Sequence, residues 1–178
     1  MAKIKISKME KEIPTESIDC GNASINALIE KSYYPTILQH AYSYIVCYDE
    51  KIIGAYMLKF VKIELEDCPE EIADYVSDMC SDCFSLHIKY IAVDEKYQRK
   101  GIGKYLLKYI VKGVRELCEN WPIRLITLDA LKEKYDWYCS LGFLPFNKED
   151  LEDDNTTIHM YLDCLIHVEK VNTYCNIE

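Results

Sequence analysis

The stretch Tyr97-Gln98-Arg99-Lys100-Gly101-Ile102-Gly103-Lys104 decides the fold predicted for this chain. It follows residues 86–93, an apolar and β-branched run that is typical of a buried strand. After it, apolar residues recur at helical spacing from Leu106 to Cys118, which predicts a helix that begins at the two glycines. Glycine lets a ligand approach the backbone closely, and the first turn of a helix has unpaired N–H groups. The sequence therefore predicts an anion-binding loop suited to a pyrophosphate.

Two common phosphate-binding loops do not fit this stretch. A dinucleotide fingerprint needs a third glycine three residues after Gly103, and a P-loop needs Gly-Lys followed by Ser or Thr. The motif Gln98-x-x-Gly101-x-Gly103 resembles instead the acetyl-CoA-binding motif Gln/Arg-x-x-Gly-x-Gly/Ala of the GNAT superfamily of N-acetyltransferases. The resemblance covers about residues 40–163. It implies an α/β fold with a mixed, mostly antiparallel central sheet that is splayed in the middle and flanked by helices.

The same resemblance implies which groups meet acetyl-CoA. Residues at the end of the strand would contact the pantetheine arm, and the Ile91 amide would polarise the thioester carbonyl. The loop would hold the pyrophosphate largely through backbone N–H groups, with added charge from Arg99 and Lys100. The predicted cofactor-binding residues are Ile91, Ala92, Val93, Gln98, Arg99, Lys100, Gly101, Ile102, Gly103 and Lys104.

A second motif nominates the catalytic acid. Residues 138–143, Tyr-Cys-Ser-Leu-Gly-Phe, resemble the GNAT pattern Tyr-x-x-x-Gly-Phe, in which the tyrosine lies beside the CoA sulfur. A phenol with a pKa near ~10 is protonated at neutral pH, so it can protonate the leaving thiolate. The resemblance implies this role for Tyr138. The alternative is a core aromatic, in a chain that has 15 tyrosines.

The general base is predicted less directly. Some GNAT enzymes carry a glutamate six residues before the last apolar position of the strand, and His87 has that place here. An imidazole with a pKa near ~6.5 suits a base. A structural role for His87, with water as the proton acceptor, remains the alternative. The sequence has no Gly-x-Ser-x-Gly motif, which favours direct transfer over an acyl-enzyme.

Composition sets the broad class of the protein. The 178 residues are 49% apolar, which predicts one globular domain spanning residues 1–178. No run of eighteen apolar residues and no signal peptide is present, and nine scattered cysteines suit a reducing compartment, so we expect a cytoplasmic protein without a membrane partner. The net charge of −9 argues against a generally basic nucleic-acid-binding surface.

The remaining elements are predicted from local patterns. In chain order these are an edge strand at 3–7, a capped helix from Asn22 to Ser32 that ends before Pro35, a hairpin of strands 43–48 and 52–60, a strand at 123–128, a helix that follows Asp129-Ala130 and is closed by Gly142, an acidic turn at 147–155 and a last strand at 156–162.

An acidic insertion is predicted at about residues 63–85. Eight carboxylates and no Lys or Arg lie between Ile63 and Leu86. One interpretation is a solvated helical insertion that turns Ile72, Tyr75, Val76 and Met79 inward, and the other is a surface that attracts a cationic acceptor. Cys80-x-x-Cys83 lacks the further ligands of a structural zinc site, so no metal is predicted.

The functional hypotheses differ in which molecule accepts the acetyl group. The charge favours a small-molecule amine or a protein amino group. Residues 18–22, Ile-Asp-Cys-Gly-Asn, and Ile25-Asn26 resemble the opening of a GNAT subset that includes toxins of toxin–antitoxin pairs, or they are simply a helix cap. An acceptor such as aminoacyl-tRNA would need a basic approach surface. The other class of hypothesis is a CoA-binding module without turnover, and a homodimer stays open in either case.

Overall fold

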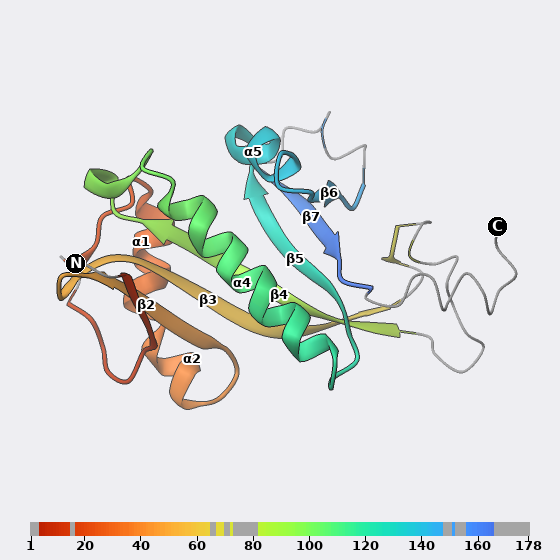
Figure 1. Ribbon diagram of the computed structural model, residues 1–178, viewed down its shortest axis with the longest axis horizontal. Helices are drawn as coiled ribbons and strands as arrows, with labels where there is room; N and C mark the ends of the chain where they lie inside the picture. The colour runs from red at the N-terminus through yellow and green to blue at the C-terminus, as the bar shows by residue number, and fades with distance from the viewer. Residues whose placement is uncertain are drawn as a thin grey trace, which may run out of the picture. The chain divides into compact units, whose positions relative to one another are not determined.

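The computed structural model describes residues 4–14, 17–64, 67–69, 72, 82–147, 151 and 156–165 (Figure 1). Its elements in chain order are β1 (Ile4–Lys8), α1 (Ala23–Glu30), α2 (Tyr33–Ile37), β2 (Tyr42–Tyr48), β3 (Lys51–Glu64), β4 (Asp82–Val93), η3 (Glu95–Tyr97), α4 (Ile102–Cys118), β5 (Ile123–Leu131), η4 (Lys132–Lys134), α5 (Tyr135–Cys139), β6 (Leu144–Pro145) and β7 (Thr157–Asp163). The strands form a sheet in the order β1-β2-β3-β4-β5-β7-β6. This mixed, mostly antiparallel sheet with helices confirms the predicted fold class.

The chain divides into two compact units. The first comprises residues 1–60 and 87–110, and the second comprises residues 61–86 and 111–178. Strands β3 and β4 and helix α4 contribute residues to both units. The predicted cofactor loop belongs to the first unit, and the predicted catalytic tyrosine belongs to the second.

The predicted edge strand and hairpin in the first unit are confirmed. Strand β1 pairs antiparallel with β2, and β2 pairs antiparallel with β3. Tyr48 faces Lys51, so Asp49 and Glu50 form a two-residue turn. Both turn residues have positive φ, at 47° and 66°. Positive φ at both central positions matches the right-handed twist of the two strands, which offsets the strain in residues that are not glycine.

The helical prediction before the hairpin needs one correction. Helix α1 ends at Glu30, and Pro35 does not break it, because Pro35 lies inside the separate helix α2. Proline is tolerated there because the first turn of a helix has no intrahelical partner for its N–H groups. Ile29 of α1 packs into a core with Ile18, Met57 and Tyr90. This core fixes the N-terminal segment against strands β3 and β4 of the same unit.

Helix α4 confirms the helical spacing of apolar residues that the sequence predicts. Leu106, Leu107, Ile110 and Val114 are buried. Lys104, Lys108 and Lys112, which recur every four residues, are exposed. The helix begins at Ile102, directly after Gly101. The predicted strand, loop and helix are therefore all present.

In the second unit, β5 runs further than predicted. Asp129 and Ala130 do not lead into a helix, because they are strand residues paired with His159 and Ile158 of β7. The partner strand supplies ladder hydrogen bonds that a local pattern does not reveal. Helix α5 begins six residues later than Asp129, at Tyr135. Gly142 has φ +92° just beyond α5, which confirms its helix-terminating role.

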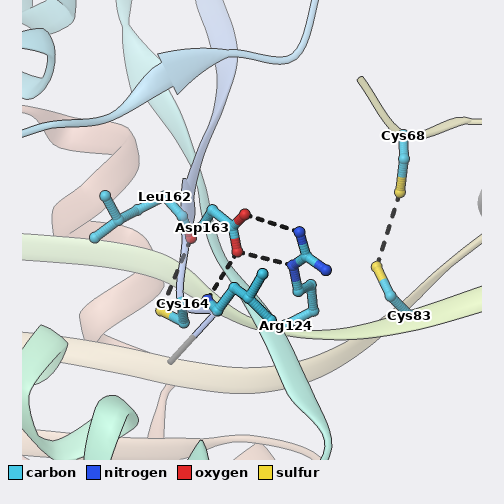
Figure 2. A network of polar contacts seen from close by, with 7 residues as sticks. Cys68, Cys83, Arg124, Leu162, Asp163 and Cys164 are labelled. Atoms are coloured by element: carbon cyan, nitrogen blue, oxygen red, sulfur yellow. Dashed lines mark hydrogen bonds and ion pairs between the residues drawn. The ribbon is translucent and has the colours of Figure 1, made fainter. Parts of the chain in front are cut away.

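A polar network fastens one end of β5 to β7 (Figure 2). Arg124 Nε donates to Asp163 Oδ1 at 2.8 Å, and Arg124 Nη2 donates to Oδ2 at 2.9 Å. The Leu165 amide also donates to Asp163 Oδ1, at 2.9 Å. Cys83 Sγ lies 3.8 Å from Cys68 Sγ, and the described cysteines are all free thiols. Two parallel N–H···O bonds hold an Arg–carboxylate pair in one geometry, so this pair fixes the β5–β7 register.

The ends of the segment predicted as an acidic insertion are strand residues, because β3 runs to Glu64 and β4 begins at Asp82. Ile72 is 3% exposed and packs with Leu125 and Tyr161, so the prediction that it turns inward is confirmed. Tyr75, Val76, Met79 and Cys80 lie outside the described residues, as does most of the predicted acidic turn at 147–155. None of the described helices has the length and apolarity needed to cross a membrane.

Candidate functional site

The loop between β4 and α4 has the backbone of an anion cradle. Arg99 and Gly101 have φ of 57° and 80°, in the left-handed region that favours glycine. A Cβ built on Gly101 would meet no atom within 4 Å, so conformation rather than space requires glycine there. The Gly101 carbonyl accepts the Tyr105 amide at 2.9 Å and so starts the first turn of α4. The first turn of a helix favours anions, so this geometry is compatible with the predicted pyrophosphate site.

Side chains of the loop bind the protein's own backbone. Gln98 Nε2 donates to the Val93 and Cys20 carbonyls, each at 2.9 Å. Lys100 Nζ donates to the Lys96 carbonyl at 2.8 Å and lies 5.2 Å from the centre of the Tyr97 ring. Arg99 and Lys100, the cationic side chains predicted to add charge, are both exposed, as is Lys104. The Gln98 and Lys100 side chains therefore shape the loop. Binding of a pyrophosphate by its backbone N–H groups stays a prediction.

Strand β4 delivers the predicted pantetheine-binding residues to the start of this loop. Ala92 and Val93 are buried, and Ile91 is half-buried. Gly54 of β3 approaches Ala92 so closely that a Cβ on Gly54 would lie 2.7 Å from the Ala92 carbonyl oxygen. Only glycine lets the two backbones meet at this distance.

We expect Gly54→Ala to lower the free energy of unfolding by about 1–3 kcal/mol, because the methyl group displaces the Ala92 backbone. Urea unfolding followed by circular dichroism measures this. Gly113→Ala is the matched control, since a Cβ on Gly113 meets nothing within 4 Å. Because Gly113 lies in the interior of α4, replacing it by alanine should raise the free energy of unfolding by about 0.5–1 kcal/mol. Equal effects of the two substitutions would contradict the close approach at Gly54.

His87 lies inside β4 and is 5% exposed. At the two-residue period of a strand it shares a face with Ile91 and Val93. The structure thus brings the candidate base onto the same strand face as two predicted cofactor contacts. Burial of the imidazole is compatible with either role that the sequence left open.

Tyr138 lies in α5, in the second unit, and is 8% exposed. Its ring packs edge-on against Trp137 and Phe143, with centroid distances of 4.7 and 5.7 Å. Burial raises the pKa of the Tyr138 phenol to about 12, because the charged phenolate is poorly solvated there. The phenol is therefore protonated at neutral pH, as a general acid for a leaving thiolate must be. The structure brings residues 87–104 together in the first unit, and Tyr138 belongs to the other.

The N-terminal segment contributes residues that the sequence analysis did not assign to the site. Asn22 Oδ1 accepts the Ile25 amide at 3.1 Å, which confirms the predicted cap of α1. The neighbouring Asp19-Cys20 peptide also contacts the loop through Gln98, Asp94 and Glu95. The pattern Asp-Cys-Gly-Asn, followed by Asn26, is the sequence signal that could have pointed to this contact. The loop residues that bond to Asp19 and Cys20 lie more than seventy residues away in the sequence, so the pattern alone does not identify them.

Comparison with known proteins agrees with the fold described above. Residues 39–145 match the family model described as an acetyltransferase (GNAT) domain. The structure resembles one described as a bacterial toxin, with a TM-score of 0.74 and 16% identity over 100% of this chain and 98% of that one. It also resembles AtaT complexed with acetyl-methionyl-tRNAfMet, with a TM-score of 0.75 and 18% identity over 97% and 99%. For AtaTR bound with AcCoA the TM-score is 0.74, with 17% identity over 97% and 98%. At these identities the likeness shows a shared fold.

Proposed function

Because the chain belongs to the GNAT family of acetyl-CoA-dependent N-acetyltransferases, we propose that its acceptor is the α-amino group of an aminoacyl-tRNA. The observation that carries this proposal is the charge of the loop and of the first turns of α4. Residues 96–108 hold five Lys or Arg residues and no Asp or Glu, in a chain of net charge −9. All five side chains, Lys96, Arg99, Lys100, Lys104 and Lys108, are exposed.

Aromatic side chains accompany this basic stretch. Tyr105 and Tyr109 are each 48% exposed, and their rings stack with centroids 6.5 Å apart. Cations neutralise phosphates, and exposed aromatic faces stack on unpaired bases such as those at the end of a tRNA. The net charge alone argued against this acceptor, whereas the local distribution supports it. The toxin structures that share the fold over nearly the whole chain, one of them in complex with an acetylated aminoacyl-tRNA, support it too.

We assign the chemical steps to the predicted residues. The amine attacks the thioester carbonyl, which the Ile91 amide polarises, and the C–S bond then breaks. Tyr138 gives its proton to the departing CoA thiolate. The proton lost by the amine goes to His87 or to water. Residues 98–104 hold the pyrophosphate during transfer, mainly through backbone N–H groups. No acyl-enzyme forms on this route.

One assay distinguishes the proposed acceptor from the alternatives. Free thiol release from acetyl-CoA is measured against charged tRNA, polyamines, amino acids, antibiotics and peptides. Release that depends on charged tRNA supports the proposal, and release with a small amine or a peptide alone overturns the acceptor while leaving the transferase. Binding of acetyl-CoA without release in any pool favours the CoA-binding module. We further propose that the protein works in the cytoplasm, where charged tRNA is available.

Charge reversal tests the proposed tRNA surface. We expect Lys96→Glu with Lys108→Glu to raise the KM for charged tRNA by on the order of tenfold at low salt, because each lost phosphate contact weakens binding. The matched control is Lys31→Glu with Lys51→Glu, which gives the same net charge at exposed positions outside this stretch. An equal rise in both double variants would mean that net charge, rather than this surface, governs tRNA binding.

A further inference from the structure

The amide of Asn26 holds the Asp19-Cys20 peptide from the side of helix α1. Asn26 Oδ1 accepts the Cys20 amide at 3.1 Å, and Asn26 Nδ2 donates to Asp19 Oδ1 at 2.8 Å. Asp19 Oδ1 also accepts the Gly21 amide at 2.9 Å, so this one oxygen accepts two hydrogen bonds. These bonds, together with a weaker contribution from Lys96, lower the pKa of Asp19, which is therefore ionised at neutral pH.

The loop after β4 holds the same peptide from the other side. The Glu95 amide donates to the Asp19 carbonyl at 2.8 Å, and the Asp19 amide donates to Asp94 Oδ2 at 3.3 Å. Gln98 Nε2 donates to the Cys20 carbonyl at 2.9 Å. Each N–H and C=O group of Asp19 and Cys20 therefore has a partner on either α1 or the loop.

Gly21 lies beside Glu95 of η3. It has φ +79°, and a Cβ built on it would clash with Glu95 Oε1. The exposed Glu95 side chain can move aside, so the left-handed backbone conformation is what favours glycine at this position.

We propose that Asn26 is a positioning residue for acetyl-CoA binding, which it supports by presenting the Cys20 carbonyl to Gln98. The inference rests on the proposed role of residues 98–104 as the pyrophosphate site. Gln98 ties the end of β4, at the Val93 carbonyl, to the N-terminal segment, at the Cys20 carbonyl. Directly after Gln98 come Arg99 and Gly101, whose left-handed backbone shapes the cradle. Fixing Gln98 at two points orders this backbone before the cofactor arrives.

A pre-ordered loop affects binding rather than the chemical step. Ordering a loop on binding costs free energy, which a bound ligand must offset. The pyrophosphate lies far along the cofactor from the thioester, so it is held equally in the ground state and the transition state. Loss of such uniform binding raises KM and leaves kcat unchanged.

The first test replaces Asn26 by leucine, which has a similar size and no polar atoms. We expect the Kd and KM for acetyl-CoA to rise about tenfold, with kcat within about twofold of wild type. Backbone amides of residues 99–103 should also exchange hydrogen faster in the cofactor-free variant, because the loop is less ordered. Unchanged Kd and unchanged exchange would overturn the inference. Asn26→Ser, which is too short to reach both partners, provides the same test if the leucine variant does not fold.

Asn22→Ala is the matched control for a merely structural effect. It removes the cap of the same helix, a change that costs about 1 kcal/mol, and leaves the bonds of Asn26 in place. We expect its Kd for acetyl-CoA to stay within about twofold of wild type. An equal rise in the Asn22 variant would mean that any loss of α1 stability weakens binding, and the positioning role would fall.

A double-mutant cycle separates coupling from simple addition. Gln98→Met keeps the length of the side chain and removes its donors, so Asn26→Leu should then have little further effect on Kd. Additive effects would overturn the proposed route through Cys20. Failure of the wild-type protein to bind acetyl-CoA would instead contradict the proposed cofactor site. Wild-type binding together with unaffected Asn26 variants would remove only this inference.

Discussion

Replacing Tyr138 by phenylalanine is expected to lower kcat by about 10²–10⁴-fold, because the leaving CoA thiolate loses its general acid. The substitution removes one oxygen from a buried side chain and keeps the ring that packs against Trp137 and Phe143. The Kd for acetyl-CoA should therefore change little. Thiol release under saturating acetyl-CoA, together with a binding titration, measures both quantities.

Tyr135→Phe is the matched control for this experiment. It makes the same chemical change in the same short helix, three residues before Tyr138. We expect it to retain kcat within about threefold, since no catalytic role is assigned to it. If Tyr138→Phe kept full activity, Tyr138 would be a core aromatic and the acid would lie elsewhere.

The pH dependence gives a second view of the same group. Burial raises the pKa of Tyr138 to about 12, above its ordinary value of 10.0. The acid is therefore protonated well above neutral pH, and kcat should not fall from about pH 8 to about pH 10 through loss of this proton. The stability contributed by the buried neutral phenol is fully present below the unfolded pKa. It is lost as the pH rises through the folded pKa, because only the unfolded state ionises readily between the two values.

The second large effect is expected for Phe143→Ala, which should lower the free energy of unfolding by about 3–5 kcal/mol. Phe143 is 1% exposed, and its ring lies edge-on to Tyr138 at 5.7 Å. Its amide donates to the Tyr138 carbonyl at 3.2 Å. Truncation leaves a cavity beside the candidate acid, so we expect kcat to fall as well. Urea unfolding gives the free energy, and thiol release gives kcat.

Phe60→Ala is the control for this prediction, because Phe60 is 63% exposed and loses little burial on truncation. Its effect on stability should stay within about 0.5 kcal/mol. Similar losses for Phe60 and Phe143 would show that Phe143 is not part of a tightly packed core. A large stability loss with unchanged kcat would show that Tyr138 does not depend on Phe143 for its position.

Patterns within about twenty residues were sufficient to predict much of the fold. Alternation and helical spacing found the edge strand, the hairpin, α4 and β7. The same local reading failed where a distant partner decided the outcome. Asp129 and Ala130 belong to a strand because β7 pairs with them, and β4 begins at Asp82, earlier than its sequence indicates. The sequence predicts that Pro35 breaks a helix, but its place in the first turn makes it compatible with α2.

The candidate site likewise has features that local sequence predicts and features that only distant contacts decide. The loop from Gln98 to Gly103 was predicted from the sequence, because glycines at a helix start have a local meaning that needs no partner. Likewise the Tyr138 motif and the five cations of residues 96–108 are visible as sequence. The sequence alone thus determined the family, and it nominated the cofactor loop and the candidate acid, which stay predictions.

Only the tertiary structure decided how these residues are supported. Gln98 was predicted to meet the cofactor through its backbone, but its side chain reaches Cys20, 78 residues away. Burial of Tyr138 and Phe143, and the approach of Gly54 to Ala92, likewise depend on neighbours that folding brings together. Hydrogen bonds and burial depend on distance in space, and a sequence records only distance along the chain.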